Sequence, residues 1–345
     1  MSVSQKYAAI RDAAVEKFEK IKKKPLVLVG TATCGRAAGA LEVLNIFREE
    51  TGKHHLDVVV EEVGCMGHCY AEPLVVIAKP GFPTLCYGPV DEGMAQRLVA
   101  DFLVNDDPCY EFAMAALEPN DEFPTFEDFP RGVIEKKIIL ADCGLINPDD
   151  IDHYLAKDGY AALSKVLEME PLAVIKEIQD AKLRGRGGAG FPTGIKWERC
   201  YKAEGSPKYV ICNADEGDPG AFMDRAILES NPHQLIEGLI IAAYAVQASR
   251  GYIYVRAEYP LAVARLRDAL EQAREKGLLG KKMLGSDFSF DVIIFQGSGA
   301  FVCGEETALI TSIEGSPGVP NHRPPYPATS GLNGKPTVIN NVKTL

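Results

Sequence analysis

The chain is 345 residues long and 46% hydrophobic, which is enough apolar material for more than one buried core and favours two domains. It has no run of eighteen apolar residues, and its first thirty residues resemble an amphipathic helix and a strand rather than a signal peptide. We therefore expect a cytoplasmic protein with no direct membrane insertion. A formal net charge of −11 argues against a nucleic-acid partner.

The pattern of residues 1–105 predicts a small thioredoxin-like α/β domain. Its expected order is helix, strand, helix, strand, a hairpin of two short strands around Pro80 and Gly81, and a closing helix. The segments after the first helix are residues 26–30, 35–52, 55–64, 72–88 and 90–104. Residues 106–135 are rich in Asp, Glu, Pro and Phe without a sustained period, so we expect a linker there.

Residues 136–345 are predicted to form a second α/β domain, in which strands alternate with helices. The expected buried strands are residues 207–215, 251–257 and 291–299, and the expected covering helices are residues 231–249, 258–277 and 304–315. This alternation is typical of a mostly parallel, Rossmann-like sheet, whose ligand site lies at the carboxyl ends of the strands.

Nine cysteines in a chain without an export signal favour metal or core roles over a disulfide framework. Cys65 and Cys69 lie on an expected turn after residues 55–64, and Cys34 lies in the first strand-helix connection. Four other cysteines have no partner at ligand spacing and are expected in the core. These are Cys109, Cys143, Cys200 and Cys212.

The glycine-rich segment 183–197, here called the glycine loop, is the most specific feature of the sequence. It carries five glycines within ten residues, which lets backbone N–H groups converge on an anion. Lys196 can add positive charge beside a phosphate, and Phe191 can lie against a flat ring. Glycine loops are often only tight turns, but this combination favours a phosphate-bearing aromatic cofactor.

The sequence LRGRGGAGFPTGIKW of this loop resembles the FMN and NADH loop of the flavoprotein subunit of respiratory complex I. The same loop occurs in the diaphorase subunits of NAD-linked hydrogenases and formate dehydrogenases. Three further segments, residues 212–225, 299–315 and 323–345, match this family in the expected order. The resemblance is strong over residues 136–345 and looser over the first hundred, and it implies a Rossmann-like FMN- and NADH-binding domain.

The resemblance implies that FMN contacts the glycine loop, the polar residues after the strand at 207–215, the segment around residue 304, and an asparagine pair. The residues assigned to FMN in this way are Gly185, Arg186, Gly187, Gly188, Lys196, Asn213, Asp215, Glu216, Asp218, Phe301, Gly304, Glu305, Asn340 and Asn341. Taken alone, the Asn-Ala-Asp-Glu segment would indicate only a turn, and the asparagine pair only a loop.

The resemblance also implies an NADH site. Its expected residues are Phe191, Glu306, Arg323 and Tyr326. Glu306 is expected to contact the adenosine ribose hydroxyls and to repel a 2′-phosphate, which would select NADH over NADPH. The alternative is that two carboxylates at a helix start simply suit the helix dipole.

Three residues depart from the usual pattern of the family. Asp218 stands where a glutamate is usual, Arg199 where an aromatic residue is usual, and Phe301 where a tyrosine is common. These departures bear on nicotinamide affinity and adenine stacking more than on FMN binding.

In thioredoxin-like ferredoxins, two cysteines of the first loop and two of a C-x-x-x-C turn hold a [2Fe-2S] cluster. Here Cys34, Cys65 and Cys69 match, but Val29 stands at the fourth position and cannot be a ligand. Cys86 could supply the fourth ligand, a non-thiol group could, or the cluster could have been lost. His68 is expected to be a surface turn residue.

The resemblance implies an NADH:acceptor oxidoreductase module. Hydride would pass between NADH and FMN without a protein acid or base, and single electrons would then pass to iron-sulfur subunits of a redox complex. The same residues are equally compatible with the reverse reaction, in which electrons from the redox partner reduce NAD. The alternative is a non-catalytic flavin-containing assembly or electron-relay subunit.

In the family, a ubiquitin-like domain and a helical domain with a [4Fe-4S] cluster follow the segment that ends this chain. We therefore expect that cluster only in a longer form of the chain, of which these 345 residues would be a fragment. The alternative is that the electrons leave by another route.

Overall fold

The computed structural model describes residues 1–130, 132–218 and 220–345, which form two compact units. The C-terminal unit comprises Met1–Asp12, Tyr154–Leu228 and Pro232–Leu345, and the N-terminal unit comprises Ala13–His153 and Glu229–Asn231. Helix α1 (Val3–Ile21) contributes residues to both units. Among the described residues, we find no helix whose length and hydropathy would let it span a bilayer.

The unit boundaries differ from the boundary expected near residue 135. Residues 136–153 belong to the N-terminal unit. In that unit, Lys17 pairs with Asp150 and Asp152 at 2.7 and 2.9 Å. The imidazole of His153 lies 3.1 Å from the carboxylate of Glu61. These long-range contacts have no signature in the local sequence pattern.

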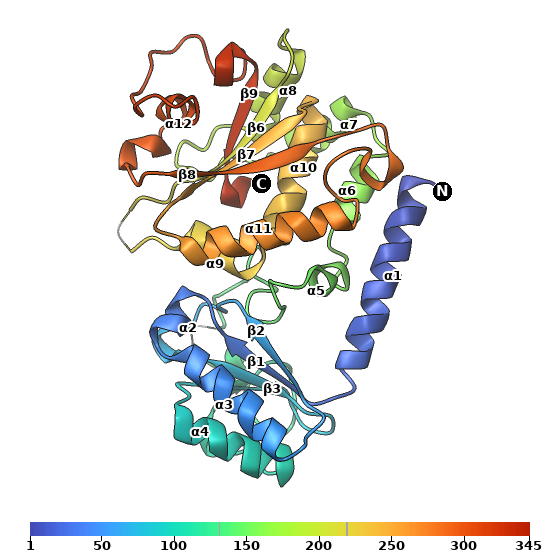
Figure 1. Cartoon of the computed structure of the whole chain (residues 1–345), viewed down its shortest axis with the longest axis vertical. Coiled ribbons are helices and arrows are strands. Elements are labelled where there is room, and N and C mark those ends of the chain that lie inside the picture. Colours follow the sequence, from blue (N-terminus) through green and yellow to red (C-terminus); the bar gives the residue numbers. More distant parts are fainter. Residues whose placement is uncertain (131, 219) are drawn as a thin grey trace. The chain divides into compact units, whose positions relative to one another are not determined.

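The N-terminal unit contains a five-stranded mixed sheet in the order β2-β1-β3-β4-β5 (Figure 1). Its strands are β1 (Leu26–Gly30), β2 (Val59–Val63), β3 (Val75–Ala78), β4 (Leu85–Tyr87) and β5 (Ala113–Ala116). Its helices are α2 (Thr33–Ala37), α3 (Ala40–Lys53) and α4 (Glu92–Arg97), and α4 continues as a π-helical segment, Leu98–Val104. The short helix α5 (Ile151–Leu155) contributes residues to both units.

The pairing of these strands is that of a thioredoxin-like fold, as the sequence predicts. Strand β1 pairs in parallel with β2 and antiparallel with β3, and β3 and β4 form the expected hairpin. Strand β5 lies within the expected linker and extends the sheet beside β4. Both faces of β1 are buried, because Val27 and Val29 contact one hydrophobic cluster and Leu26 and Leu28 the other.

The C-terminal unit contains a four-stranded sheet, β8-β7-β6-β9, in which all neighbouring strands are parallel (Figure 1). Its strands are β6 (Tyr209–Ala214), β7 (Arg250–Arg256), β8 (Asp291–Gly297) and β9 (Thr337–Asn341). Its helices are α6 (Ala161–Val166), α7 (Pro171–Asp180), α8 (Thr193–Lys202), α10 (Pro232–Val246), α11 (Pro260–Glu275) and α12 (Glu306–Ile313). Helix α9 (Met223–Ser230) lies mostly in this unit. The predicted parallel, Rossmann-like sheet is thus confirmed.

Strand β9 is not predicted by the sequence pattern, and it completes the sheet beside β6. The register pairs Cys212 with Asn340 and Asn213 with Asn341. Because the two strands are parallel, their polar carboxyl ends meet at one edge of the sheet. The four cysteines expected in the core, including Cys212, are all buried.

A buried carboxylate holds the start of helix α6 in the C-terminal unit. Glu237 of α10 accepts hydrogen bonds from the backbone N–H groups of Tyr160 and Leu163 at 2.7 and 3.0 Å. It also accepts one from the Tyr154 hydroxyl at 2.6 Å. These donors include N–H groups that an N-terminal helix turn cannot satisfy within itself.

We predict that Glu237→Ala lowers the free energy of unfolding by about 2–4 kcal/mol. The substitution leaves three buried hydrogen-bond donors without their acceptor. Urea denaturation followed by circular dichroism measures this loss. Glu177→Ala is the control, since Glu177 makes an exposed ion pair with Lys165 and such pairs contribute little. Equal, small losses in both variants would show that the carboxylate is not a structural cap.

Candidate functional site

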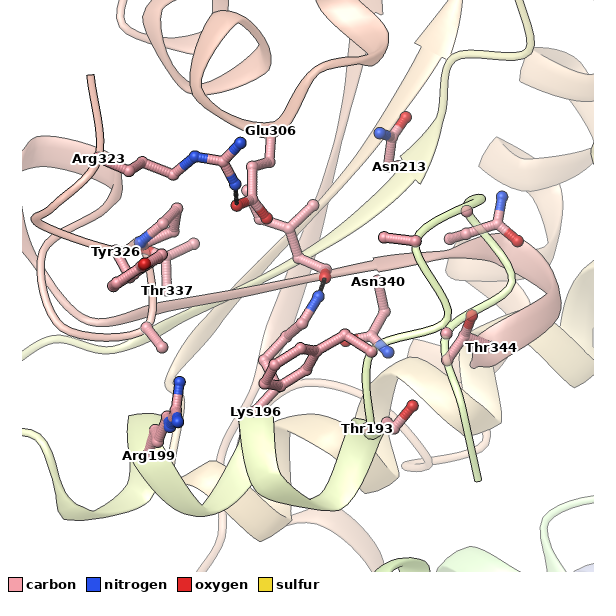
Figure 2. A pocket seen from close by; sticks show the side chains of 18 of the residues that line it. Thr193, Lys196, Arg199, Asn213, Glu306, Arg323, Tyr326, Thr337, Asn340 and Thr344 are labelled. Atoms are coloured by element: carbon pink, nitrogen blue, oxygen red, sulfur yellow. Dashed lines mark hydrogen bonds and ion pairs between the residues drawn. The ribbon is translucent and has the colours of Figure 1, made fainter. Parts of the chain in front are cut away.

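A cavity of about 930 Å³ opens at the carboxyl ends of β6 and β9 in the C-terminal unit (Figure 2). Its wall is formed by the glycine loop, helix α8, the start of α12 and the segment 323–329. Lys196 and Arg199 extend from α8 toward the strands, and Glu306 and Arg323 lie across from them. The volume is in the range of small-molecule and cofactor sites.

The glycine loop presents backbone rather than side chains to this cavity. Its base is closed by the hydrogen bond from Gly185 N to Phe191 O at 2.9 Å. A Cβ built on Gly187 would lie 3.5 Å from the Cβ of Asn341 and would occupy space at the cavity wall. Gly188 and Gly190 have positive φ angles of 108° and 61°, which favour glycine.

Helix α8 contributes Lys196 and Thr193 to the cavity wall. Lys196 donates from Nζ to the carbonyl of Ile339 at 2.8 Å. Burial lowers the pKa of Lys196, and the nearby Glu306 counteracts this. The Oγ1 of Thr193, in the first turn of α8, is buried and has no hydrogen-bond partner in the described structure. A ligand with acceptor oxygens would satisfy this atom and the positive end of the helix.

The carboxyl end of β6 supplies Asn213, whose side chain is fixed from both sides. Its Nδ2 donates to Gly304 O at 2.9 Å, and its Oδ1 accepts from Asp215 N at 3.1 Å. Asp215 lies 3.2 Å from Arg256. Burial raises the pKa of Asp215, while Arg256 lowers it. Glu216 accepts from the N–H groups of Asp224 and Arg225 and so caps the start of α9.

The start of α12 places two carboxylates at the cavity. Glu305 caps the helix by accepting from the N–H groups of Thr307 and Ala308 at 2.9 and 3.0 Å. Burial alone would raise the pKa of Glu305, but these hydrogen bonds and Arg323 leave it lowered. Glu306 pairs with Arg323 at 2.5 Å. A carboxylate fixed in this way can accept hydrogen bonds from ligand hydroxyls.

Most of the residues predicted for the site line this one cavity. They are Gly185, Gly187, Phe191, Lys196, Asn213, Gly304, Glu305, Glu306, Arg323, Tyr326, Asn340 and Asn341. Other predicted residues are not part of its wall: Arg186, Gly188, Asp215, Glu216, Asp218 and Phe301. Of these, Asp215 and Glu216 make the structural contacts described above, while Asp218 and Phe301 are exposed.

The structure adds wall residues that the sequence reasoning did not assign to the site. These are Ala189, Gly190, Thr193, Arg199, Lys202, Ala203, Pro327, Ala328, Thr329, Thr337, Ile339 and Thr344. Thr193 and Arg199 lie three residues on either side of Lys196, so helical spacing could have identified them. In the sequence, Arg199 is notable only because the family usually has an aromatic residue at this position. In the structure, its guanidinium lies 5.6 Å from the centroid of the Phe191 ring.

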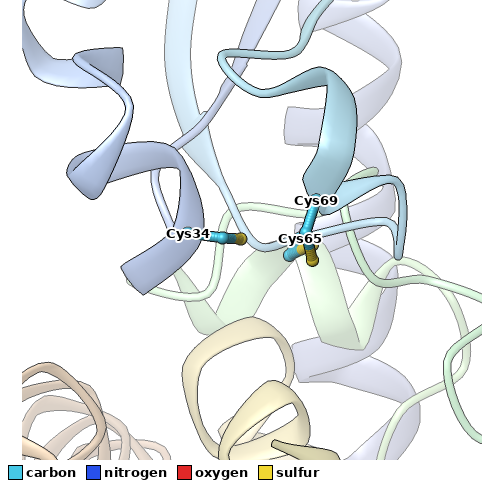
Figure 3. Close-up of side chains that lie close together, drawn as sticks. All are labelled: Cys34, Cys65 and Cys69. Atoms are coloured by element: carbon cyan, nitrogen blue, oxygen red, sulfur yellow. The ribbon is translucent and has the colours of Figure 1, made fainter. Parts of the chain in front are cut away.

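In the N-terminal unit, the thiols of Cys34, Cys65 and Cys69 all lie within 4.8 Å of one another (Figure 3). Cys34 comes from α2, and Cys65 and Cys69 come from the turn after β2. The hydrogen bond with Cys65 and burial raise the pKa of Cys34. Three clustered thiols can ligate iron or zinc once they lose their protons.

The structure does not bring Cys86 to this group. Its side chain is fully buried on the face of β4 that contacts Met66, with Sγ 3.9 Å from the Met66 sulfur. The alternation of side chains along β4 therefore makes Cys86 a core residue. His68 was expected on the surface, but it is buried and stacks on Phe126 at 4.5 Å between ring centroids.

Comparison with known proteins agrees with this geometry. Residues 178–345 match the Nuo51 FMN-binding domain. Over 208 residues, the chain is 54% identical to the NADP-reducing hydrogenase subunit HndC of Solidesulfovibrio fructosivorans. This alignment covers 60% of this chain and 42% of HndC. Over 195 residues, the chain is 55% identical to a subunit of the NADH-quinone oxidoreductase of Aquifex aeolicus, covering 56% and 46%.

A solved structure extends the similarity beyond the family match. The NAD⁺-reducing [NiFe]-hydrogenase in the H2-reduced state aligns over 93% of this chain and 51% of that chain, with 29% identity and a TM-score of 0.51. The chain therefore spans less than half of the two curated relatives and about half of the solved chain. The resemblance drawn from the four motifs is confirmed.

Asp224 lies beside the cavity and carries an unbalanced charge. Its Oδ2 accepts from Asn341 Nδ2 at 2.7 Å, while Oδ1 is buried without a partner in the described structure. Burial, together with the charge of Glu216, raises the pKa of Asp224 to about 6. A raised folded pKa means that the folded state holds this proton more tightly than the unfolded chain. This carboxyl group therefore favours unfolding increasingly as the pH rises through about 6.

We predict that Asp224→Asn stabilises the flavin-free chain at pH 8 by up to about 3 kcal/mol, because the amide keeps the hydrogen bond without the charge. The gain should shrink as the pH falls below about 6 and vanish near pH 4. Urea denaturation at several pH values measures it, with the exposed Asp287→Asn as control. A variant that is less stable than the parent at pH 8 would contradict this assignment.

Proposed function

We propose that this chain is the NADH-oxidising flavoprotein module of a multisubunit redox complex. It binds FMN in the cavity of the C-terminal unit, transfers hydride between NADH and FMN, and passes single electrons to iron-sulfur clusters. The observation that carries this proposal is a cavity of about 930 Å³ that combines a wall of glycines, a half-buried lysine and the ends of two parallel strands. The part of the chain that forms it matches an FMN-binding domain.

The wall residues fit FMN in character. The unpartnered hydroxyl of Thr193, the ammonium of Lys196 and the start of α8 suit a phosphate. Asn213, Asn340 and Asn341 offer amide groups to ribityl hydroxyls and ring heteroatoms. Gly185 and Gly187 leave room for a flat ring, because no side chain projects from them into the cavity.

The residues that we assign to NADH line the same cavity. Glu306 can accept hydrogen bonds from ribose hydroxyls, and Arg323 holds it in place. Arg323 also supplies positive charge for the pyrophosphate, while Phe191, Tyr326 and the guanidinium of Arg199 offer flat surfaces for adenine. Arg186, Gly188, Asp215, Glu216, Asp218 and Phe301 remain proposed contacts that depend on the ligand-bound state.

The chain's own residues act by binding and orientation. FMN, when bound, supplies the hydride-accepting and single-electron chemistry. Glu305 is occupied as a helix cap and Glu306 as the partner of Arg323, so neither carboxylate is placed as a general base. The wall holds the two ring systems together and excludes water from between them. The same arrangement serves both directions of electron flow.

The partners follow from the relatives. The two curated relatives are named as subunits of a hydrogenase and of an NADH-quinone oxidoreductase. We therefore propose iron-sulfur subunits of such a complex as the electron partners. The three clustered thiols support a [2Fe-2S] cluster in the N-terminal unit. All nine cysteines carry free thiols, which suits a reducing, cytoplasmic location.

Anaerobic titration of the flavin-reconstituted chain with NADH tests the proposal. We expect the oxidised flavin absorbance to bleach with one NADH per flavin. Lys196→Glu should reduce FMN retention at least about tenfold, because it places a negative charge beside the phosphate. The exposed Lys176→Glu on α7 should retain flavin normally. A chain that binds FMN without bleaching would support the non-catalytic alternative instead.

We predict that Glu306→Ala narrows the preference for NADH over NADPH by about tenfold, because it removes the charge that repels a 2′-phosphate. The ratio of kcat/KM values for the two nucleotides measures this change. Glu275→Ala, a substitution at the last residue of α11, serves as control because it lies outside the cavity wall. An unchanged ratio in Glu306→Ala would place the discrimination in other residues of the wall.

A further inference from the structure

The three clustered thiols of the N-terminal unit need a fourth donor to hold a metal group. Val29, at the position where a fourth cysteine would stand, is fully buried in the core on the face of β1 away from Gly30. Cys86 is buried on another strand. Valine has no ligand atom, and Cys86 is not among the clustered thiols.

The carboxylate of Glu72 lies beside this group and is hydrogen-bonded to one of its thiols. The Cys34 thiol donates to Glu72 Oε1 across 3.4 Å, and the other carboxylate oxygen accepts from Leu74 N at 2.8 Å. Glu72 is only 8% exposed. A carboxylate buried beside thiols has lost most of its hydration, and hydrogen bonds from one backbone N–H and from a thiol, which is a weak donor, only partly compensate this loss. A bound cationic group would compensate it fully.

Two glycines leave room for this carboxylate. A Cβ built on Gly30, at the end of β1, would lie 3.2 Å from Glu72 Oε2. A Cβ built on Gly35, in α2, would lie 3.1 Å from the same oxygen and only 2.0 Å from Gly30 O. The carboxylate therefore lies against the backbone of the strand-helix connection that carries Cys34.

We propose that Glu72 is the fourth ligand of an iron-sulfur cluster held by Cys34, Cys65 and Cys69. This inference rests on the proposed cluster of the N-terminal unit and is independent of flavin binding. Each thiol releases its proton to solvent as its Fe–S bond forms, and Glu72 binds through a carboxylate oxygen, so no electron changes hands in ligation. Replacing a thiolate with a harder, less donating ligand changes the reduction potential and the spectrum of the cluster.

The test uses the full chain reconstituted anaerobically with ferric iron and sulfide, so that the iron already has the oxidation state of the oxidised cluster. Iron and sulfide analysis and electron paramagnetic resonance of the reduced protein are the readouts. Glu72→Gln keeps an acceptor for Leu74 N but removes the charged ligand, so it should lose at least about tenfold in cluster content or in resistance to chelators. Glu62→Gln, a partly buried carboxylate on β2, is the matched control and should behave as the parent.

A rescue variant separates ligation from folding. In the double variant Gly30→Cys/Glu72→Ala, the Cβ of the introduced cysteine lies 3.2 Å from the position that Glu72 Oε2 occupies in the parent. We expect this variant to regain the cluster with a spectrum different from that of the parent, because the fourth ligand is now sulfur.

Three results would overturn the proposal. The first is a Glu72→Gln variant with the iron content and resonance spectrum of the parent. The second is a parent chain that takes up a single zinc ion instead of iron and sulfide. The third is a parent chain that takes up no metal. FMN retention, measured on the same samples, reports on the C-terminal unit alone. A chain that retains FMN but forms no cluster would therefore defeat this inference and leave the flavin proposal standing.

Discussion

The parallel pairing of β9 with β6 is the contact on which the site in the C-terminal unit depends. It joins Thr337–Asn341 to Tyr209–Ala214, more than a hundred residues earlier in the chain, and places two asparagines beside Asn213. The glycine loop lies against these strand ends, where a Cβ on Gly187 would be in van der Waals contact with Asn341. Without β9, the cavity would lose the wall to which Lys196 is anchored through Ile339 O.

Charge compensation shapes both candidate sites. In the cavity, Glu306 is paired with Arg323 and Glu305 is held by helix N–H groups, so the carboxylates are fixed before a ligand arrives. The hydroxyl of Thr193 and the ammonium of Lys196 are instead only partly satisfied, which favours an anionic ligand. At the thiol cluster the sign is reversed, since Glu72 and three potential thiolates favour a cation. Each site thus attracts a group of opposite charge.

Local sequence patterns predict much of this molecule. The hydrophobic runs around residues 26–30 and 207–215 are short, apolar and bounded by turn residues, so both sheets could be anticipated. The ligand site could be located from the sequence because its glycines and its lysine all lie in one continuous segment. Strand β9 was missed, since Thr337–Asn341 lies among proline, glycine and asparagine residues and becomes a strand only beside β6. The position of Glu72 beside Cys34 and the burial of Cys86, which the sequence offered as a possible ligand, could not be predicted because tertiary packing sets both.

The most direct test of the central claim is a crystal structure of the chain with FMN. We predict density for the flavin in the cavity of the C-terminal unit, with its phosphate in contact with Lys196 and Thr193 and its ring against the glycine loop. Flavin found outside this cavity, or a cavity left empty at saturating FMN while flavin binds in solution, would contradict the account.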